Sequence, residues 1–217
     1  MNSIGFKEPD VIYIPISGLE GDNLIEPCTN PKLTSWWKGE CLIDLLDKLN
    51  VPRKVITKPQ RATVMDYVPR TQGVLIGDCV QVKVEAGIIT EKDELLLMPQ
   101  NVISGIKGIE IKGIRCDQVA AGTICDLGLK LPNDFDVNYL KKGTVLCDPA
   151  YPIPLIRKFV AMVVIYDLPQ QALTKGENVI VHGYTSKSAG KIVSLLSTVD
   201  QSKGTIIKSH PKFLRAG

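Results

Sequence analysis

Histidine is nearly absent from this sequence, and the cysteines form no metal-binding pattern. Only two histidines occur, His182 and His210, and they lie far apart in the sequence. The six cysteines include no C-x-x-C pair, which is the spacing that structural zinc sites use. The sequence therefore gives little support to a histidine-based active site or a zinc site, and we expect the cysteines to be buried, reduced thiols.

Long hydrophobic runs are also missing. Apolar stretches such as 159–165 and 192–196 fall far short of the roughly 20 residues that a helix needs to cross a bilayer. The first ten residues lack the basic region and apolar core of a secretory signal. We therefore expect a cytoplasmic protein without a transmembrane helix.

The phosphate-binding motif G-x-x-x-x-G-K-[ST] does not occur. Its nearest approach, Gly190-Lys191, is followed by Ile192 and has Thr185 in place of the first glycine, so both the loop and the magnesium-binding hydroxyl fail. No G-x-S-x-G or H-E-x-x-H motif is present either. Neighbouring carboxylates are expected to be solvated, on a helix face or in a turn: Asp44, Asp47, Glu91, Asp93 and Glu94. No catalytic residue is predicted.

Composition and charge indicate a globular protein with a basic C-terminal portion. With 217 residues, 44% hydrophobic and 23% charged, the chain is long enough for two modules with real cores. The net charge is +3, but residues 1–50 hold four lysines against eight acids, which leaves +7 for the rest. This asymmetry permits contact with RNA, and a solvated basic surface explains it equally well.

Two local patterns open the chain and precede a linker. The β-rich run 11–16 leads into a turn-prone stretch and predicts a strand followed by a loop. Apolar residues at spacings of three and four predict a helix over 36–49, ending before Pro52. Two prolines and several basic residues in 51–60 are typical of an extended linker.

Short apolar runs separated by turns follow the linker. Their spacing predicts a small barrel or sandwich, with strands at 62–68, 74–84, 94–98, 106–111, 124–131 and 144–147. Three prolines in 148–154 precede further strand-like runs at 158–166, 178–181 and 191–199. These are too few for a closed barrel, so we expect a second, incomplete β module that lacks its C-terminal strands.

The segment VIYIPISGLEGDNL at 11–24 resembles the end of the G domain in the elongation factor 1-alpha superfamily, where V-P-I-S-G-x-x-G-D-N carries the fifth guanine-nucleotide motif. WWKGECLIDLLD at 36–47 is similar to the helix that follows, and KPQR at 58–61 to the entry into domain 2. Gln60 departs from the hydrophobic or basic residue that most members have there.

The resemblance continues through VKVEAGII at 82–89, AAG at 120–122 and PKFL at 211–214, similar to strands and turns of domains 2 and 3. Features of 37–42, 84–87 and 95–99 look more like the Hbs1 branch, while VLCDP at 145–149 is similar to the release factor eRF3. The resemblance implies a mainly β fold: a strand-loop-helix remnant of the α/β G domain (1–50), a six-stranded-type translation-factor β-barrel as domain 2 (55–150), and an incomplete domain 3 β-barrel (155–217).

The resemblance also implies sites. Backbone amides at Ser17, Gly18 and Leu19 would meet the guanine base in the whole protein, with GTP and Mg2+ bound there. This chain lacks the P-loop, so no cofactor and no GTP hydrolysis are expected from it alone. Candidate partner contacts are Glu85, Gly87, Lys208 and Lys212.

The predicted function is the barrel portion of a translational GTPase that delivers a tRNA-like, Pelota-type factor to the ribosomal A site during ribosome rescue. The alternatives are elongation factor 1-alpha delivering aminoacyl-tRNA, and eRF3 delivering an eRF1-like factor in termination. An alternative of another class is a stand-alone β-barrel that binds RNA or protein. The expected partners are thus the ribosome and one of these factors, with no membrane.

Overall fold

The fold is mainly β, with 7% of residues in helices and 39% in strands. The computed structural model describes residues 11–69, 79–166, 172–200 and 203–215. The chain divides into two compact units, Met1–Arg53 and Lys54–Gly217, which are described separately. Among the described residues, no helix has the length and hydropathy that a bilayer span requires.

The first unit holds two short helices, α1 (Pro31–Thr34) and α2 (Leu42–Asp47). The predicted helix over 36–49 is therefore wrong in extent. Residues 37–41 are not helical, and a Cβ on Gly39 would overlap the Trp37 ring. The amides of Leu42 and Ile43 instead donate to the carbonyls of Asn23 and Leu24 at 3.1 and 3.0 Å, so the helix begins only after Cys41.

The predicted strand at 11–16 is also wrong, because these residues have no regular secondary structure. A strand is defined by backbone hydrogen bonds to a neighbouring strand, and no ladder within the described residues includes this segment. The β-rich composition of the segment therefore did not suffice to make it a strand.

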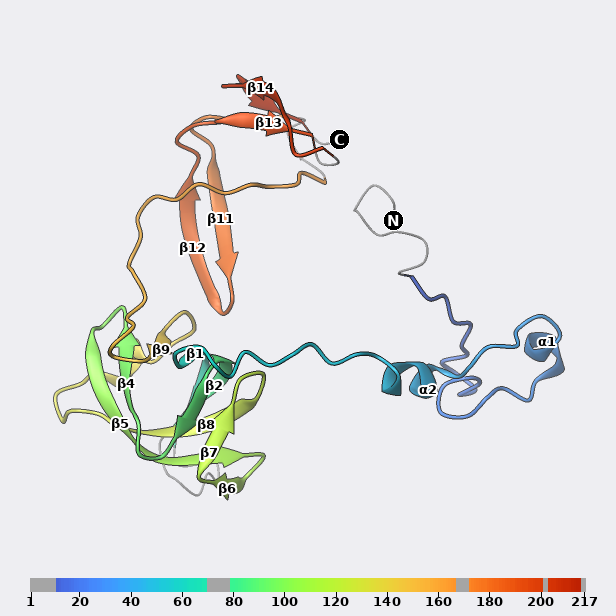
Figure 1. The fold of residues 1–217 in the computed structure, drawn as a ribbon, viewed down its shortest axis with the longest axis horizontal. Helices are drawn as coiled ribbons and strands as arrows, with labels where there is room; N and C mark the ends of the chain where they lie inside the picture. Colours follow the sequence, from blue (N-terminus) through green and yellow to red (C-terminus); the bar gives the residue numbers. More distant parts are fainter. Residues whose placement is uncertain (1–10, 70–78, 167–171, 201–202, 216–217) are drawn as a thin grey trace. The chain divides into compact units, whose positions relative to one another are not determined.

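The second unit begins with a closed six-stranded antiparallel barrel (Figure 1). The hydrogen-bonded order is β4-β9-β1-β2-β8-β5, and β5 pairs back with β4. Closure leaves no open sheet edge among these strands. The barrel strands are β1 (Arg61–Val68), β2 (Cys79–Ala86), β4 (Glu94–Met98), β5 (Val102–Ile111), β8 (Ile124–Lys130) and β9 (Val145–Cys147).

Three short strands and one 3-10 turn lie outside the six barrel strands. β6 (Ile114–Cys116) pairs with β5, β3 (Ile88–Thr90) pairs with β7 (Gln118–Ala120), and a 3-10 turn, η4, spans Val137–Tyr139. The predicted barrel strands are thus confirmed where they are described, while 74–78 lies outside the described residues. The sequence did not predict β3, β6 and β7, which are only three residues long.

Buried and outward-facing side chains alternate along the barrel strands, and the buried ones fill the interior. In β2, Val80, Val82 and Val84 are fully buried, while Gln81 and Lys83 point outward. These valines belong to a core that also contains Val64, Ile89, Leu97, Ile109, Leu127 and Leu146. The period-two pattern read from the sequence therefore places the correct side chains inside.

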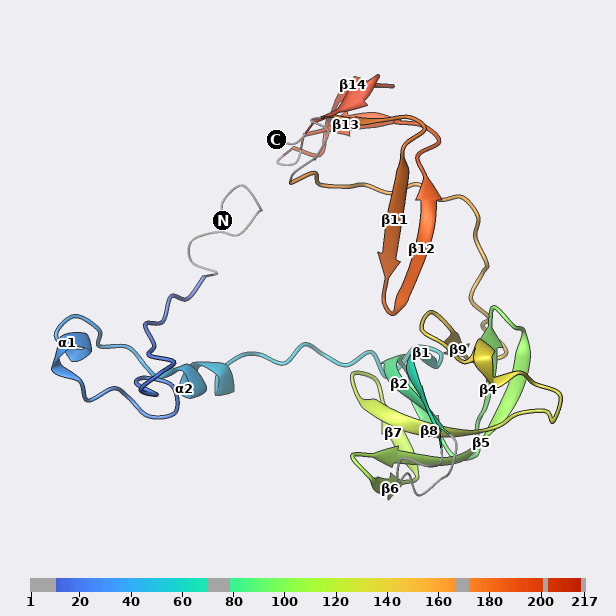
Figure 2. The same ribbon diagram turned by 180° about the vertical axis from the view of Figure 1, so that it is seen from behind.

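The remaining strands form three two-stranded ladders among the described residues, in keeping with the expected incomplete second β-barrel. They are β10 (Leu173–Thr174) with β15 (Phe213–Leu214), β11 (Asn178–Gly183) with β12 (Ser186–Lys191), and β13 (Ser197–Val199) with β14 (Ile206–Ser209). Figure 2 shows the β11–β12 hairpin, whose turn places Tyr184 at φ 50.

The predicted strand at 158–166 is wrong. This apolar segment has no strand assignment, and Phe159 and Met162 are 57% and 87% exposed. Within the described residues it has no partner strand to satisfy its backbone. The predicted run at 191–199 is likewise only β13 and the last residue of β12.

Candidate functional site

The predicted guanine-contacting loop is closed by the backbone of Ser17. The Ser17 carbonyl accepts from the Gly21 amide at 2.9 Å, and the Ser17 amide donates to the Asp22 carbonyl at 3.1 Å. The Ser17 hydroxyl oxygen accepts from the Glu20 amide at 3.2 Å. These bonds leave Gly18 and Leu19 at the tip, where Leu19 is 96% exposed.

The amides of Gly18 and Leu19 donate no hydrogen bond within the described part of the chain. Both groups therefore remain able to donate to an acceptor outside the loop. A ligand carbonyl is the kind of acceptor that two adjacent loop amides can bind. The geometry is compatible with the predicted role for Gly18 and Leu19. The Ser17 amide already donates to the Asp22 carbonyl within the loop, so a contact of Ser17 with the base stays a prediction.

Asn23 anchors the loop and was missing from the predicted site residues. It lies at φ 59, a left-handed conformation that asparagine tolerates better than most residues. Its Nδ2 donates to the Pro15 carbonyl at 2.9 Å, and the residue is only 1% exposed. Since its own carbonyl accepts from Leu42, Asn23 connects the loop to α2. The sequence signal that could have identified it is the consecutive run Gly21-Asp22-Asn23, which is part of the motif quoted for this loop.

Gly87, a predicted partner contact, has a structural role in the barrel. It lies at φ +77, and a Cβ there would stand 2.9 Å from both the Gln60 Cα and the Lys58 carbonyl oxygen. Its amide donates to the Val55 carbonyl at 2.8 Å. Only glycine allows the linker to pass this close to the β2–β3 turn.

Glu85, the neighbouring predicted contact, lies among barrel side chains. Its Oε1 is 3.4 Å from the Thr63 hydroxyl and 3.5 Å from the Lys83 Nζ. These contacts hold the carboxylate along the outer face of β1 and β2. A contact with a partner stays a prediction for both Glu85 and Gly87.

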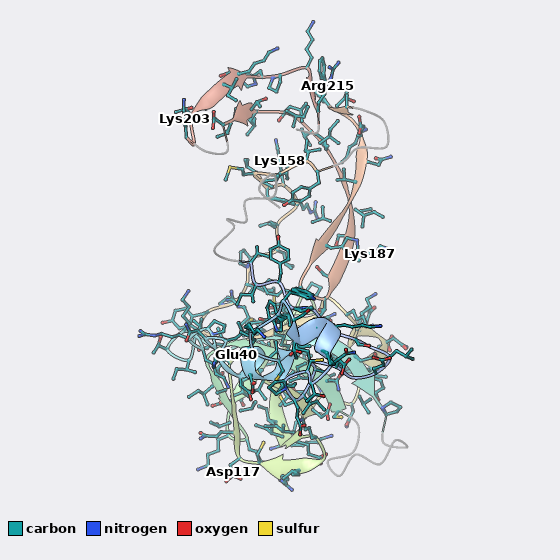
Figure 3. The ribbon with its side chains drawn as sticks, turned by 90° about the vertical axis from the view of Figure 1, so that its right-hand side faces the viewer. Glu40, Asp117, Lys158, Lys187, Lys203 and Arg215 are labelled. Carbon is teal, nitrogen blue, oxygen red and sulfur yellow. The ribbon has the colours of Figure 1, made fainter. Side chains whose placement is uncertain are left out.

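The predicted basic contacts lie in the C-terminal strands. Lys208 is exposed in β14, and Lys212 is exposed just before β15. Figure 3 shows the side chains of Lys187, Lys203 and Arg215 spread over this region rather than meeting at one point. A distributed arrangement of cations suits an extended anionic surface better than a single phosphate.

A hydrogen-bonded turn replaces the solvated carboxylates expected at 91–94. The Asp93 Oδ2 accepts from the Thr90 amide at 2.7 Å and from the Gln60 side-chain amide at 2.6 Å. Gln60 also donates to the Ile88 carbonyl at 2.9 Å. Glu91 pairs with Arg115 at 3.1 Å. The expectation of simple solvation is therefore wrong for Asp93 and Glu91.

A polar row crosses the outer face of three barrel strands. Asp126 on β8 lies opposite Gln81 on β2 and Glu110 on β5. Burial and the charge of Glu110 raise the pKa of the Asp126 carboxyl, although a hydrogen bond from Gln81 opposes the shift. The sequence did not single out this row, because the three residues are far apart along the chain.

The six cysteines differ in how deeply they are buried. All six are free thiols, and four are buried as predicted: Cys41, Cys79, Cys125 and Cys147. The prediction of burial is wrong for Cys28 and Cys116, which are only partly buried. Burial, with the charge of Asp126, raises the pKa of Cys125 to about 12, so this thiol is protonated at neutral pH. No group of three or more His, Cys, Asp or Glu within the described ranges could hold a metal ion.

Comparison with known proteins gives matches along the whole chain. Residues 158–217 match the family described as GTP-eEF1A C-terminal domain-like. Protein HBS1 of Drosophila melanogaster is 28% identical over 210 residues, covering 97% of this chain and 30% of that protein. Elongation factor 1-alpha of Picrophilus torridus is 32% identical over 218 residues, covering 100% of this chain and 48% of that protein.

Solved structures share the fold. Sup35 complexed with GMPPNP matches with a TM-score of 0.65 and 24% identity, covering 96% of this chain and 48% of that one. Apo SelB from Methanococcus maripaludis matches with a TM-score of 0.63 and 17% identity, covering 81% of this chain and 36% of that one. The chain spans about half or less of the length of these relatives. The resemblance to the elongation factor 1-alpha superfamily that the motifs predicted is therefore confirmed, since residues 158–217 match its C-terminal domain family and both HBS1 and elongation factor 1-alpha are similar along nearly the whole chain.

Proposed function

We propose that this chain is the barrel portion of a translational GTPase that delivers a Pelota-like protein factor to the ribosomal A site. The supporting observation is the similarity to HBS1 across 97% of the chain, a stretch that includes the closed barrel. In this proposal the protein works in the cytoplasm, and the barrel presents rigid surfaces to the ribosome and the delivered factor.

The loop at 17–23 would contact the guanine base in the whole protein. The two unpaired amides at Gly18 and Leu19 would donate to the base, while the Ser17 bonds hold the turn. No segment of this chain supplies the glycine amides, lysine and hydroxyl that bind phosphates and Mg2+. The proposal therefore assigns GTP and Mg2+ binding to the whole protein and no hydrolysis to this chain alone.

The bonds between the loop and α2 suggest how nucleotide state would be transmitted. The carbonyls of Asn23 and Leu24 accept from the first two amides of α2. A displacement of the loop would therefore carry α2 with it as one body. Nucleotide-dependent loop movement is a common origin of larger domain movements in switch proteins.

Two functions within the superfamily remain as alternatives. The 32% identity to elongation factor 1-alpha favours delivery of aminoacyl-tRNA, and the fold shared with Sup35 is compatible with delivery of an eRF1-like termination factor. A stand-alone RNA- or protein-binding barrel is the alternative of another class. It would bind its partner equally well with GTP, with GDP or without nucleotide.

A competition pull-down separates these functions. The intact protein is immobilised with GTP or GDP and offered a Pelota-like factor, an eRF1-like factor and aminoacyl-tRNA together. The proposal expects GTP-dependent retention of the Pelota-like factor. Preferential retention of aminoacyl-tRNA or the eRF1-like factor would replace it with the corresponding alternative, and nucleotide-independent binding would favour the stand-alone module.

A second experiment tests the loop. In the intact protein, Leu19→Pro removes the amide donor, while Leu19→Ala keeps it and removes only an exposed side chain. One lost hydrogen bond is worth about 0.5–1.5 kcal/mol, which is roughly a two- to tenfold loss of affinity. Leu19→Pro should therefore weaken GDP binding in a fluorescence titration, whereas Leu19→Ala should not. Equal affinities of the two variants would contradict the assignment of the Leu19 amide.

A further inference from the structure

A groove lies on the barrel between two connections that the proposed function does not use. One wall is the turn from β4 to β5, and the other is the segment that joins β8 to β9. Its volume is about 590 Å3, within the range of roughly 300–1,000 Å3 that binding pockets occupy. The lining residues are Pro99, Gln100, Val102, Pro132, Asp134, Phe135, Asp136 and Tyr139.

Aromatic and proline side chains give the groove an apolar surface of fixed shape. The Phe135 and Tyr139 rings meet edge to face, with centroids 6.4 Å apart and planes at 68°. Phe135 also packs against the barrel core, which restrains its ring. Tyr139 is 53% exposed, so a large part of its surface is available for contact.

One hydrogen bond joins the two walls, and a second fixes the wall formed by the β8–β9 connection, before any ligand binds. The Gln100 Nε2 donates to the Tyr139 carbonyl at 3.2 Å, and the Thr144 hydroxyl donates to the same carbonyl at 3.0 Å. The groove is therefore preorganised, which lowers the entropy lost on binding.

The groove has one unpaired acceptor and two carboxylates among its lining residues. The Gln100 Oε1 is buried and accepts no hydrogen bond in the described structure, although buried oxygens are normally paired. Asp136 is held in place because its Oδ1 accepts from the Asn138 amide and Nδ2 at 2.9 and 2.8 Å. Neither Asp134 nor Asp136 forms an ion pair with any described residue.

These features define the chemistry of an occupant. An extended peptide can place prolines against aromatic rings and donate a backbone amide to an unpaired acceptor. Two carboxylates at the same groove favour an arginine or lysine side chain and repel the phosphates of a nucleic acid. We infer that the groove binds an extended, proline-containing segment of a partner protein that carries an arginine or lysine.

The inference is tested with the full chain and a fluorescent probe peptide, Arg-Pro-Leu-Pro-Arg-Pro-Leu-Pro. Controls are the same peptide with glutamate in place of arginine, and an oligouridine of similar length. Binding is followed by fluorescence anisotropy, and the site is located by amide chemical-shift changes. The protein variants are Asp134→Lys, Tyr139→Ala and a control on the same barrel, Glu94→Lys, which changes an exposed charge on β4.

The arginine peptide should bind with shift changes at 99–102 and 132–139. Asp134→Lys should weaken it by about fivefold or more and should reduce its sensitivity to salt, while Glu94→Lys should leave it unchanged. Circular dichroism establishes that each variant is folded. Three outcomes would overturn the inference: no binding below about 1 mM, equal binding of the glutamate peptide, or binding of oligouridine at the same residues.

Discussion

The side-chain amide of Gln60 donates to the carboxylate of Asp93 at 2.6 Å, although the two residues are 33 positions apart. The bond fixes the end of the linker against the β3–β4 turn, where Asp93 also accepts from the Thr90 amide. The same Gln60 amide also donates to the Ile88 carbonyl at 2.9 Å, so one side chain ties the linker to both β3 and the turn that follows it.

Removal of the Asp93 carboxylate should destabilise the barrel. In Asp93→Ala the Thr90 amide and the Gln60 side chain both lose an acceptor, and hydrogen bonds to charged groups are worth about 1.5–3 kcal/mol. Because Asp93 is only partly buried, water can replace part of these bonds. We therefore expect the unfolding free energy to fall by about 1–2 kcal/mol, near the lower end of that range. Urea unfolding followed by circular dichroism measures it, with Glu94→Ala as the control. A loss no larger than that of the control would show that solvent replaces both bonds.

Gly87→Ala should destabilise the second unit more than Gly113→Ala. Both glycines have nearly the same positive φ, +77 and +76, but a Cβ at Gly87 meets the linker backbone while a Cβ at Gly113 meets nothing within 4 Å. The shared backbone strain costs about 1 kcal/mol. The close approach should add about 1–2 kcal/mol more at Gly87. Denaturant midpoints of the two variants give the difference, and equal midpoints would mean that the linker shifts aside.

Asp126 should make barrel stability fall as pH rises. Its pKa is raised in the folded state, first by burial and then by Glu110, so the native protein holds this proton more tightly than the unfolded chain. The unfolding free energy therefore decreases as pH rises from the unfolded pKa near 3.8 through the raised folded value. Asp126→Asn should flatten this part of the profile and increase stability at neutral pH.

The measurement for Asp126 is urea unfolding at a series of pH values from acid to neutral. Glu94→Gln removes a carboxylate that is exposed on β4 and serves as the matched control. Parallel profiles for Asp126→Asn and the unmodified protein would show that Asp126 does not contribute the pH dependence.

Reversal of charge at Lys208 and Lys212 should weaken binding of the intact protein to ribosomes. Each lost phosphate contact reduces the slope of log K against log salt by about 0.7–0.9. The double variant Lys208→Glu/Lys212→Glu should therefore bind more weakly at low salt and with a smaller salt dependence. Sedimentation with purified ribosomes at several salt concentrations measures both effects, with Lys32→Glu as the control. An unchanged slope would show that Lys208 and Lys212 do not contact ribosomal phosphates.

Local patterns predicted the barrel well where alternation and burial agree. Val80, Val82 and Val84 alternate in the sequence and fill the core, because side chains on a strand point to opposite faces in turn. Local patterns failed where the partner of a segment decides its structure. The apolar residues of 158–166 resemble a strand, yet no described strand pairs with them.

The amino-acid sequence by itself determined the resemblance to the elongation factor 1-alpha superfamily, the barrel strands and the absence of a phosphate-binding motif, since motif spacing and strand periodicity are local properties. Tertiary structure alone decided the late start of α2, the passage of the linker beside Gly87, the Gln60–Asp93 bond and the row of Gln81, Asp126 and Glu110. Each of these depends on groups that are distant along the chain and meet only after the barrel closes or the loop folds back.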